Sequence, residues 1–287
     1  MSFQITTAMV EQYSANVQIL QQQKQSRLRP AVRVESGVVG KNAYFDQIAA
    51  TSAVKRTTRH ADTPLVNTPH LRRGVSLYDY DWADLVDNMD TSKILTDPTS
   101  KYVVNAHNAM NRSMDDEVIA AALATSYGGV DGTTTYPFDS TNCQIAHASA
   151  GLTLAKVITA KMKLDAAEVD DEDRYFILGS KQLGDMLATT EVKSKDYNTV
   201  QALVNGQIDK FLGFTWIRSE RLQVATNVYS CLAFQKNSIL LGIGLDVIVD
   251  VGPRRDKNMA TQVYLGMSIG ATRMDQVGVI EVQAYNV

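Results

Sequence analysis

The 287-residue sequence predicts an α+β fold built around one unusually long helix. Three observations carry this prediction. An apolar stripe at helical spacing lies between Asp97-Pro98 and Gly128-Gly129. Before it, a stretch from Val32 to Ser76 alternates weakly and is rich in Thr, Val and Gly, which favours extended strands. After residue 227 the chain consists mostly of short apolar runs typical of β-strands.

The bulk composition is that of an ordinary globular protein, with 45% hydrophobic and 21% charged residues. A formal net charge of -3 argues against a protein that coats nucleic acid nonspecifically, because that task favours an excess of Lys and Arg. The sequence shows neither an apolar run long enough for a membrane span nor a signal peptide, so we expect synthesis and action in a cytoplasm. Cys143 and Cys231 lack metal spacing, and we expect two reduced, partly buried thiols.

Residues 1–31 are interpreted as an N-terminal arm. Val10, Tyr13, Val17 and Leu20 recur at helical spacing, which predicts a short amphipathic helix over Val10 to Lys24. A helix with so little beside it to bury is expected to dock on a neighbouring molecule or on the rest of the fold.

Residues 32–77 are interpreted as an outsized hairpin of two long strands, joined by a mobile tip near Arg56 to Asp62. A two-stranded ribbon is marginally stable in water on its own. We therefore expect this hairpin to lie against other protein, and specifically against another copy of the same chain.

Charge supports that expectation, because the hairpin is basic and an acidic run follows it. The hairpin holds seven Lys or Arg residues against three acids, and the acidic run comprises Asp79, Asp81, Asp84, Asp87 and Asp90. Opposite patches steer and register association. The candidate subunit-interface residues are Arg56, Arg59, Arg72, Arg73, Asp84 and Asp87. The acidic run could equally pair with the hairpin within one subunit, and this alternative stays open.

Residues 78–144 contain a short acidic and aromatic segment, Tyr78 to Met89, followed by the long helix at about 97–127. A helix of about 28 residues would span roughly 42 Å, which is long for a globular domain. Its predicted buried stripe includes His107, interpreted as a packing histidine.

Residues 145–226 alternate between helix and strand signals, and residues 227–287 are mostly strands. The predicted elements are helices at 153–167, 180–187 and 198–204, strands at 174–178, 206–217, 228–234, 246–251, 261–272 and 277–284, and a helical turn at 235–241. We expect two subdomains, one from about 145–226 and one from the long helix with the C-terminal strands.

Patterns that could carry chemistry are weak. Gly242-Ile-Gly244 lacks the third glycine and the following helix of a dinucleotide-binding loop. The four histidines show no metal-binding spacing. The acidic runs Asp115 to Glu117 and Asp170 to Asp173 are interpreted as solvated faces, since consecutive acids point in different directions. We therefore expect no catalytic, metal or cofactor site.

Four ordered stretches resemble the major capsid proteins of tailed bacteriophages. They are YDYDWADLVDNMDTSKILTDPTSKYVVNAHNAMNRSMDDEVIAAALAT, DRYFILGSKQLGDMLAT with NGQIDKFLGFTWIRSERL, CLAFQKNSILLGIGLDVIVDV, and YLGMSIGATRMDQVGVIEVQAYN. The resemblance covers nearly the whole chain, and it implies a Hong Kong 97-like capsid fold.

In that fold the resemblance implies an N-terminal arm (1–31), an extended loop over the neighbouring subunit (32–77), a peripheral domain with the spine helix (78–144), an axial domain (145–226) and C-terminal strands completing the peripheral domain (227–287). It implies hexamers and pentamers that tile an icosahedral shell around double-stranded DNA, in a virion assembled in the host cytoplasm.

The partners implied are many copies of the chain, a portal, packaged DNA and possible decoration proteins, with no membrane. A separate scaffolding protein is hypothesised, because no long extension precedes the arm. Lys41 and Lys55 lie in the loop, but no motif marks either for the covalent crosslinking seen in some relatives. Two alternatives remain: an encapsulin-like compartment shell, and a cytoplasmic α/β enzyme that uses the Gly242 region.

Overall fold

The computed structural model describes residues 21–59, 62–87, 99–188 and 210–286. The chain divides into two compact units. One comprises residues 1–25, 79–112 and 246–267, and the other comprises residues 26–78, 113–245 and 268–287. The long helix α2 (Thr99–Leu123) and the strands β13 (Ile239–Arg254) and β14 (Ala260–Arg273) each contribute residues to both units.

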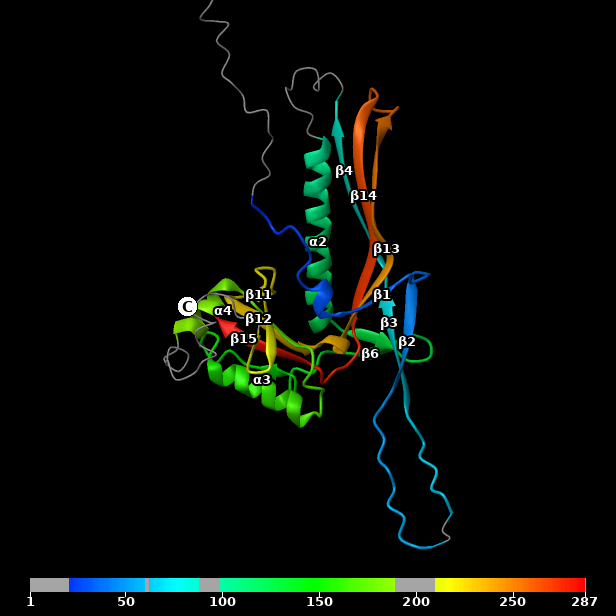
Figure 1. The fold of residues 1–287 in the computed structure, drawn as a ribbon, viewed down its shortest axis with the longest axis vertical. Helices are drawn as coiled ribbons and strands as arrows, with labels where there is room; N and C mark the ends of the chain where they lie inside the picture. Colours follow the sequence, from blue (N-terminus) through cyan, green and yellow to red (C-terminus); the bar gives the residue numbers. More distant parts are fainter. Residues whose placement is uncertain (1–20, 60–61, 88–98, 189–209, 287) are drawn as a thin grey trace, which may run out of the picture. The chain divides into compact units, whose positions relative to one another are not determined.

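The longest strands form a four-stranded sheet with the order β1-β13-β14-β4. Its outer members are β1 (Arg33–Ser36) and β4 (Tyr78–Val86). Figure 1 shows β4, β14 and β13 running side by side. The sequence predicted strands at 246–251 and 261–272, and the structure confirms both and extends them. It also makes a strand of the acidic segment after Tyr78, which sequence analysis had left without a regular element.

A seven-stranded sheet forms the centre of the larger unit, in the order β7-β15-β12-β8-β10-β9 with β11 paired to β12. Helix α3 (Leu154–Ala166) packs on β15 and β7, and Figure 1 shows it next to β15. The strands are β7 (Gln144–Ile145), β8 (Arg174–Leu178), β9 (Lys210–Phe211), β10 (Phe214–Arg218), β11 (Val224–Ala225), β12 (Val228–Gln235) and β15 (Val279–Tyr285).

The core of this sheet is apolar because its central strands are buried on both faces. Phe176, Ile177 and Leu178 of β8 are fully buried, and so are Leu232 and Phe234 of β12. Such continuous apolar runs are typical of buried strands. Strands β12 and β15 belong to the same sheet as β8 and β10 of the central segment, whereas β13 and β14 share their sheet with β4.

The third sheet has the order β2-β3-β5-β6 and contains the hairpin. Its strands are β2 (Asn42–Ile48), β3 (His70–Ser76), β5 (Ser126–Gly128) and β6 (Thr134–Tyr136). The two hairpin strands have seven residues each. The sequence predicted two longer strands that continue to a tip near Arg56. This prediction is wrong, because the described residues between 49 and 69 form no helix or strand.

Helix α2 has 25 residues and ends at Leu123, short of the predicted end at Gly128. The reason is that Ser126–Gly128 pairs with β3 and β6. Arg273 fixes this end: its Nη1 donates to the carbonyl oxygens of Ala122 and Ala124, both at 2.8 Å. A guanidinium suits a helix C-terminus, where carbonyl groups lack partners within the helix.

The buried face of α2 follows most of the predicted stripe, except that Ala106 is buried in place of His107. Ala106, Met110, Met114 and Val118 are buried, but His107 is exposed, so its interpretation as a packing residue is wrong. Within the described ranges, the remaining helical elements are α4 (Ser180–Ala188), η2 (Arg29–Ala31) and η3 (Lys236–Ser238). The predicted helix at 198–204 and most of that at Val10 to Lys24 lie outside the described residues, and residues 21–24 are not helical.

Candidate subunit interface

The hairpin is fixed to the rest of its unit at its base. Val75 of β3 packs with Leu240 and Met274, and Phe45 and Leu77 lie against this cluster. Gln47 Nε2 adds a hydrogen bond to the carbonyl oxygen of Met274, at 3.1 Å. The paired strands are therefore held by β13 and by the segment that follows β14, whereas residues 50–59 beyond them are exposed.

Arg72 lies on β3 directly opposite Asp46 of β2. Its Nε donates to Asp46 Oδ1 at 2.7 Å, and its guanidinium lies 5.9 Å from the centre of the Tyr44 ring. The hydrogen bond and charge of Arg72 lower the pKa of Asp46. This cross-strand pair is exposed to solvent. It therefore adds little to the folding stability, and its main effect is to favour this pairing register of the two strands.

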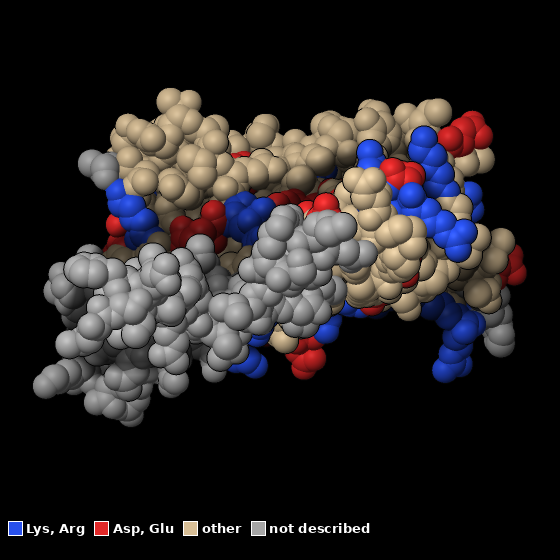
Figure 2. Space-filling view, turned by 90° about the horizontal axis from the view of Figure 1, so that it is seen from above, with Lys and Arg blue, Asp and Glu red and all other residues tan. Residues whose placement is uncertain are grey.

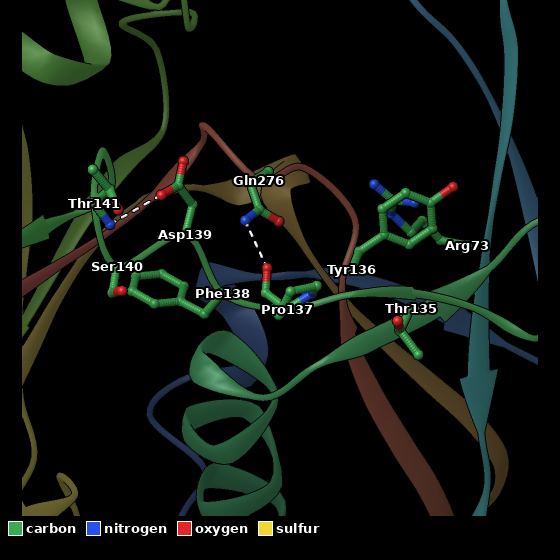
Figure 3. Close-up of a pocket in the computed structure, with 9 residues that line it drawn as sticks. All are labelled: Arg73, Thr135, Tyr136, Pro137, Phe138, Asp139, Ser140, Thr141 and Gln276. Carbon is green, nitrogen blue, oxygen red and sulfur yellow. Dashed lines mark hydrogen bonds between the residues drawn. The ribbon is translucent and has the colours of Figure 1, made fainter.

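Arg73 points the other way and is only 6% exposed. Its guanidinium stacks on the Tyr136 ring, with 3.4 Å between its carbon and the ring centre, and its Nε donates to the carbonyl oxygen of Met274 at 3.3 Å. Figure 3 shows the stacked pair at one side of a hollow. Arg73 therefore fastens the hairpin to its own subunit, and its interface role remains only a prediction.

The hollow beside Arg73 has a volume of about 510 Å³. Figure 3 shows Asp139 and Gln276 on its wall, each already engaged. Asp139 accepts from the backbone N–H groups of Thr141 and Asn142 and from the Asn142 amide, which lowers its pKa. Gln276 Nε2 donates to the carbonyl oxygen of Pro137 at 2.8 Å. These side chains brace a loop, and they form no pair of nucleophile and base.

Arg56 and Arg59 lie in the exposed stretch beyond the paired hairpin strands, together with Lys55. The Nε of Arg56 donates to the carbonyl oxygen of Thr58 at 3.0 Å, within the same stretch. Figure 2 shows basic and acidic side chains both present among neutral residues on the face that it presents. Arg56 and Arg59 are both exposed, and their contact with another copy stays a prediction.

Asp79, Asp81 and Asp84 of the acidic run lie on β4, which is an outer strand of its sheet, and Asp87 directly follows the strand. Asp84 is exposed, and its Oδ1 accepts from the backbone N–H of Leu85 at 2.8 Å. Asp87 is half-buried. Asp81 accepts a hydrogen bond from the Tyr264 hydroxyl on β14 at 2.5 Å, which raises the pKa of that tyrosine. Asp90 lies outside the described residues, and pairing of this run with a hairpin stays a prediction.

Sequence reasoning missed the role of Asp115, which it treated as part of a solvated face. Asp115 is 0% exposed. Its carboxylate accepts from Ser26 Oγ at 2.6 Å and from the backbone N–H groups of Arg27 and Leu28, both at 3.1 Å. The signal was available, because Asn111, Asp115 and Ile119 follow helical spacing on the buried face. The side chain of Asp116, next in sequence, is partly exposed and forms an ion pair with Arg221.

A second buried charge ties the central segment together. The Lys156 ammonium donates to the carbonyl oxygens of His147, Ala150 and Gly151 at 2.8 Å each, and lies 3.1 Å from that of Gln283. Burial lowers the pKa of Lys156. The ammonium group has three N–H donors and four carbonyl oxygens around it, so all of its donors are already used in structural hydrogen bonds.

The described residues supply no catalytic arrangement at the weak motifs. Gly242 and Gly244 lie inside β13, where a Cβ on Gly244 would come within 2.6 Å of Leu77, so close packing explains that glycine. No group of His, Cys, Asp or Glu in the described part could hold a metal ion. Both cysteines are buried as predicted, and burial raises the pKa of Cys231 to about 12. No described helix is long and apolar enough to cross a membrane.

Phage capsids are among the solved structures that this chain resembles. The chain matches the capsid of cyanophage P-SCSP1u with a TM-score of 0.75 and 17% identity, over 99% of this chain and 95% of the other. It matches the capsid of Ralstonia phage GP4 with a TM-score of 0.74 and 11% identity, over 97% and 96%. The match to Mycobacterium phage Che8 has a TM-score of 0.72 and 13% identity, over 96% of each chain.

Sequence comparison gives the family. No curated protein matches the chain. The family model described as phage capsid protein matches residues 5–285, which is nearly the whole chain. Together with the fold, which confirms the predicted Hong Kong 97-like class, this match shows that the chain belongs to the phage capsid protein family.

Proposed function

We propose that this chain is the major capsid protein of a tailed bacteriophage, and that its copies form hexamers and pentamers of an icosahedral shell enclosing double-stranded DNA. The observation that carries the proposal is the family match over residues 5–285. The exposed basic stretch after β2 supports it, because such a stretch has little to bury in its own subunit.

The role is structural, and its mechanism is assembly. Contacts that are individually weak let subunits correct errors before closure, and many repeated contacts then stabilise the closed shell. We propose a separate scaffolding protein, a portal and assembly in the host cytoplasm, with decoration proteins as possible further partners. Lys156, Arg174 and Asp115 are buried and hydrogen-bonded, which fits a chain whose charged groups hold structure rather than perform chemistry.

The proposed domain division starts from the expected boundaries and moves two strands. The arm remains 1–31, the extended loop 32–77 and the peripheral domain 78–144 with the spine helix α2. The axial domain is 145–226 together with β12 and β15, which share its sheet. Strands β13 and β14 complete the peripheral domain, because they share the sheet of β4.

The test is the size of the particles that the chain forms. The chain is expressed alone and, in parallel, with the genes adjoining its own, and both preparations are analysed by sedimentation and negative-stain microscopy. The proposal predicts closed megadalton shells in at least the second preparation. Small oligomers in both would contradict it. Shells that form around a co-expressed enzyme and exclude DNA would favour the encapsulin-like alternative.

A further inference from the structure

We propose that the unpaired edge of β13 between Leu245 and Val251 binds residues 50–59 of a second copy of this chain as an added β-strand. The inference rests on the proposed shell and names one of its contacts. In this arrangement main-chain hydrogen bonds provide the affinity for the added strand, and contacts of apolar and charged side chains provide the specificity.

The edge is unpaired because β1 is short. Strand β1 pairs with β13 only from Leu240 to Ile243, and the last bond on that side runs from the Val38 N–H to the Ile243 carbonyl oxygen, at 3.1 Å. Among the described residues, no strand is paired to that side of β13 farther along. Both N–H and C=O of a strand residue point to the same edge, and the edge alternates with each residue.

Parity then identifies the groups that face this edge. Because Ile243 faces β1, the backbone groups of Leu245, Val247, Val249 and Val251 face the unpaired side. The Val247 N–H donates to Asp246 Oδ1 at 2.9 Å within the same strand, so an added strand would exchange that bond for one of its own. Pro253 has the same parity. Proline lacks an N–H group, and within sheets it is confined to edges, strand starts and bulges, so its position agrees with an unpaired edge.

The edge is also apolar and exposed. Leu245 is 46% exposed, Ile248 44%, Val249 49% and Val251 44%. An exposed, long and apolar edge strand promotes aggregation unless another segment covers it. In a shell protein, such an edge can be covered by another copy of the chain when the subunits assemble.

Residues 50–59 suit this edge by length, exposure and charge. All ten are exposed, none is proline, and none lies in a helix or strand of its own subunit. They contain Lys55, Arg56 and Arg59 and no acid, whereas residues 245–253 of β13 contain Asp246 and Asp250 and no base. The return side of the loop is less suitable, because Pro64 and Pro69 each remove a donor.

Engineered disulfides test the pairing directly. Val54→Cys is combined in turn with Leu245→Cys, Val247→Cys, Val249→Cys and Val251→Cys, so that any register is sampled. A disulfide needs Cα atoms within about 7 Å. The two native cysteines are buried and contribute little background. The matched control pairs Val54→Cys with Val104→Cys, a residue 47% exposed on α2.

In purified, oxidised shells we expect one or two edge positions to give a ladder of multimers on a non-reducing denaturing gel, and the control to run as a monomer. Shells whose edge positions link no better than Val104 would overturn the pairing. An intrachain disulfide would also overturn it. So would crosslinking of the edge positions to Ser14→Cys in place of Val54→Cys, because the N-terminal arm would then be the segment that covers the edge. If the unmodified chain forms no shells, the proposed function fails, which is a separate result.

Two further variants test the bonds and the charges. Val249→Pro removes an edge N–H group and should lower the assembled fraction at least several-fold, whereas Val249→Thr keeps that group and should not. Asp250→Arg and Arg56→Asp should each reduce assembly, and the combination should restore it. Normal assembly of Val249→Pro, or no rescue in the charge swap, would contradict the inference; circular dichroism of the unassembled subunits checks folding.

Discussion

The buried carboxylate of Asp115 should be a major anchor of the segment that leads from the N-terminal arm into β1. Asp115→Ala removes the acceptor of the Ser26 hydroxyl and of two backbone N–H groups, those of Arg27 and Leu28. The Leu28 N–H is buried, so it finds no water in exchange. A buried donor left without a partner costs about 1–3 kcal/mol.

Adding a smaller loss at the other two donors, we expect Asp115→Ala to lower the free energy of unfolding by about 2–4 kcal/mol. The matched control is Asp116→Ala, which breaks the exposed pair with Arg221 and should cost at most about 1 kcal/mol. Urea unfolding of unassembled subunits measures both, and amide exchange at Leu28 locates the effect. Equal stability of the two variants, or unchanged exchange at Leu28, would refute the reasoning.

Four other predictions follow from the same contacts. Arg273→Met removes the donor to the carbonyl oxygens of Ala122 and Ala124 and one of the donors to that of Tyr136, so it should cost about 3 kcal/mol in urea unfolding; a loss below about 1 kcal/mol would contradict its capping role. Arg73→Glu should destabilise the folded subunit, because it places an unpaired charge at a buried site, whereas Arg72→Glu should leave the melting temperature nearly unchanged. The reverse order would be evidence against the burial of Arg73. Arg56→Glu with Arg59→Glu should lower assembly yield with normal subunit folding, and normal shells would remove these residues from the interface. Burial raises the pKa of Cys231 from 9.0 to about 12, so unfolding is favoured as the thiol of the unfolded chain ionises above pH 9. Stability present below pH 9 should therefore fall by about 1.4 kcal/mol per pH unit until about pH 12, and Cys231→Ala should flatten that part of the curve.

Sequence reasoning succeeded where one physical signal dominated. The strand at 174–178 and the helix at 153–167 follow directly from apolar patterning, and the structure places them at Arg174–Leu178 and Leu154–Ala166. The end of α2 was misplaced because it depends on tertiary partners. Strands β3 and β6 capture Ser126–Gly128, and Arg273, about 150 residues away in sequence, caps the helix.

The interface candidates show the same limit. Arg72 and Arg73 are adjacent in sequence and looked equivalent, yet neighbouring residues of a strand face opposite sides. One therefore forms an exposed pair with Asp46 and the other is buried on Tyr136. Asp115 was misread for a related reason: its helical spacing with Asn111 and Ile119 indicated a buried position, but the groups that satisfy its carboxylate there, on Ser26 to Leu28, lie far away in sequence.

The central claim is that many copies of this chain form an icosahedral shell, and cryo-electron microscopy of particles purified after co-expression with its neighbouring genes tests it most directly. We predict a closed shell in which this fold occupies rings of five and six, with residues 50–59 of each copy lying on the adjacent one. Particles whose shell is built from a different chain, or a preparation that contains only small oligomers of this one, would contradict the account.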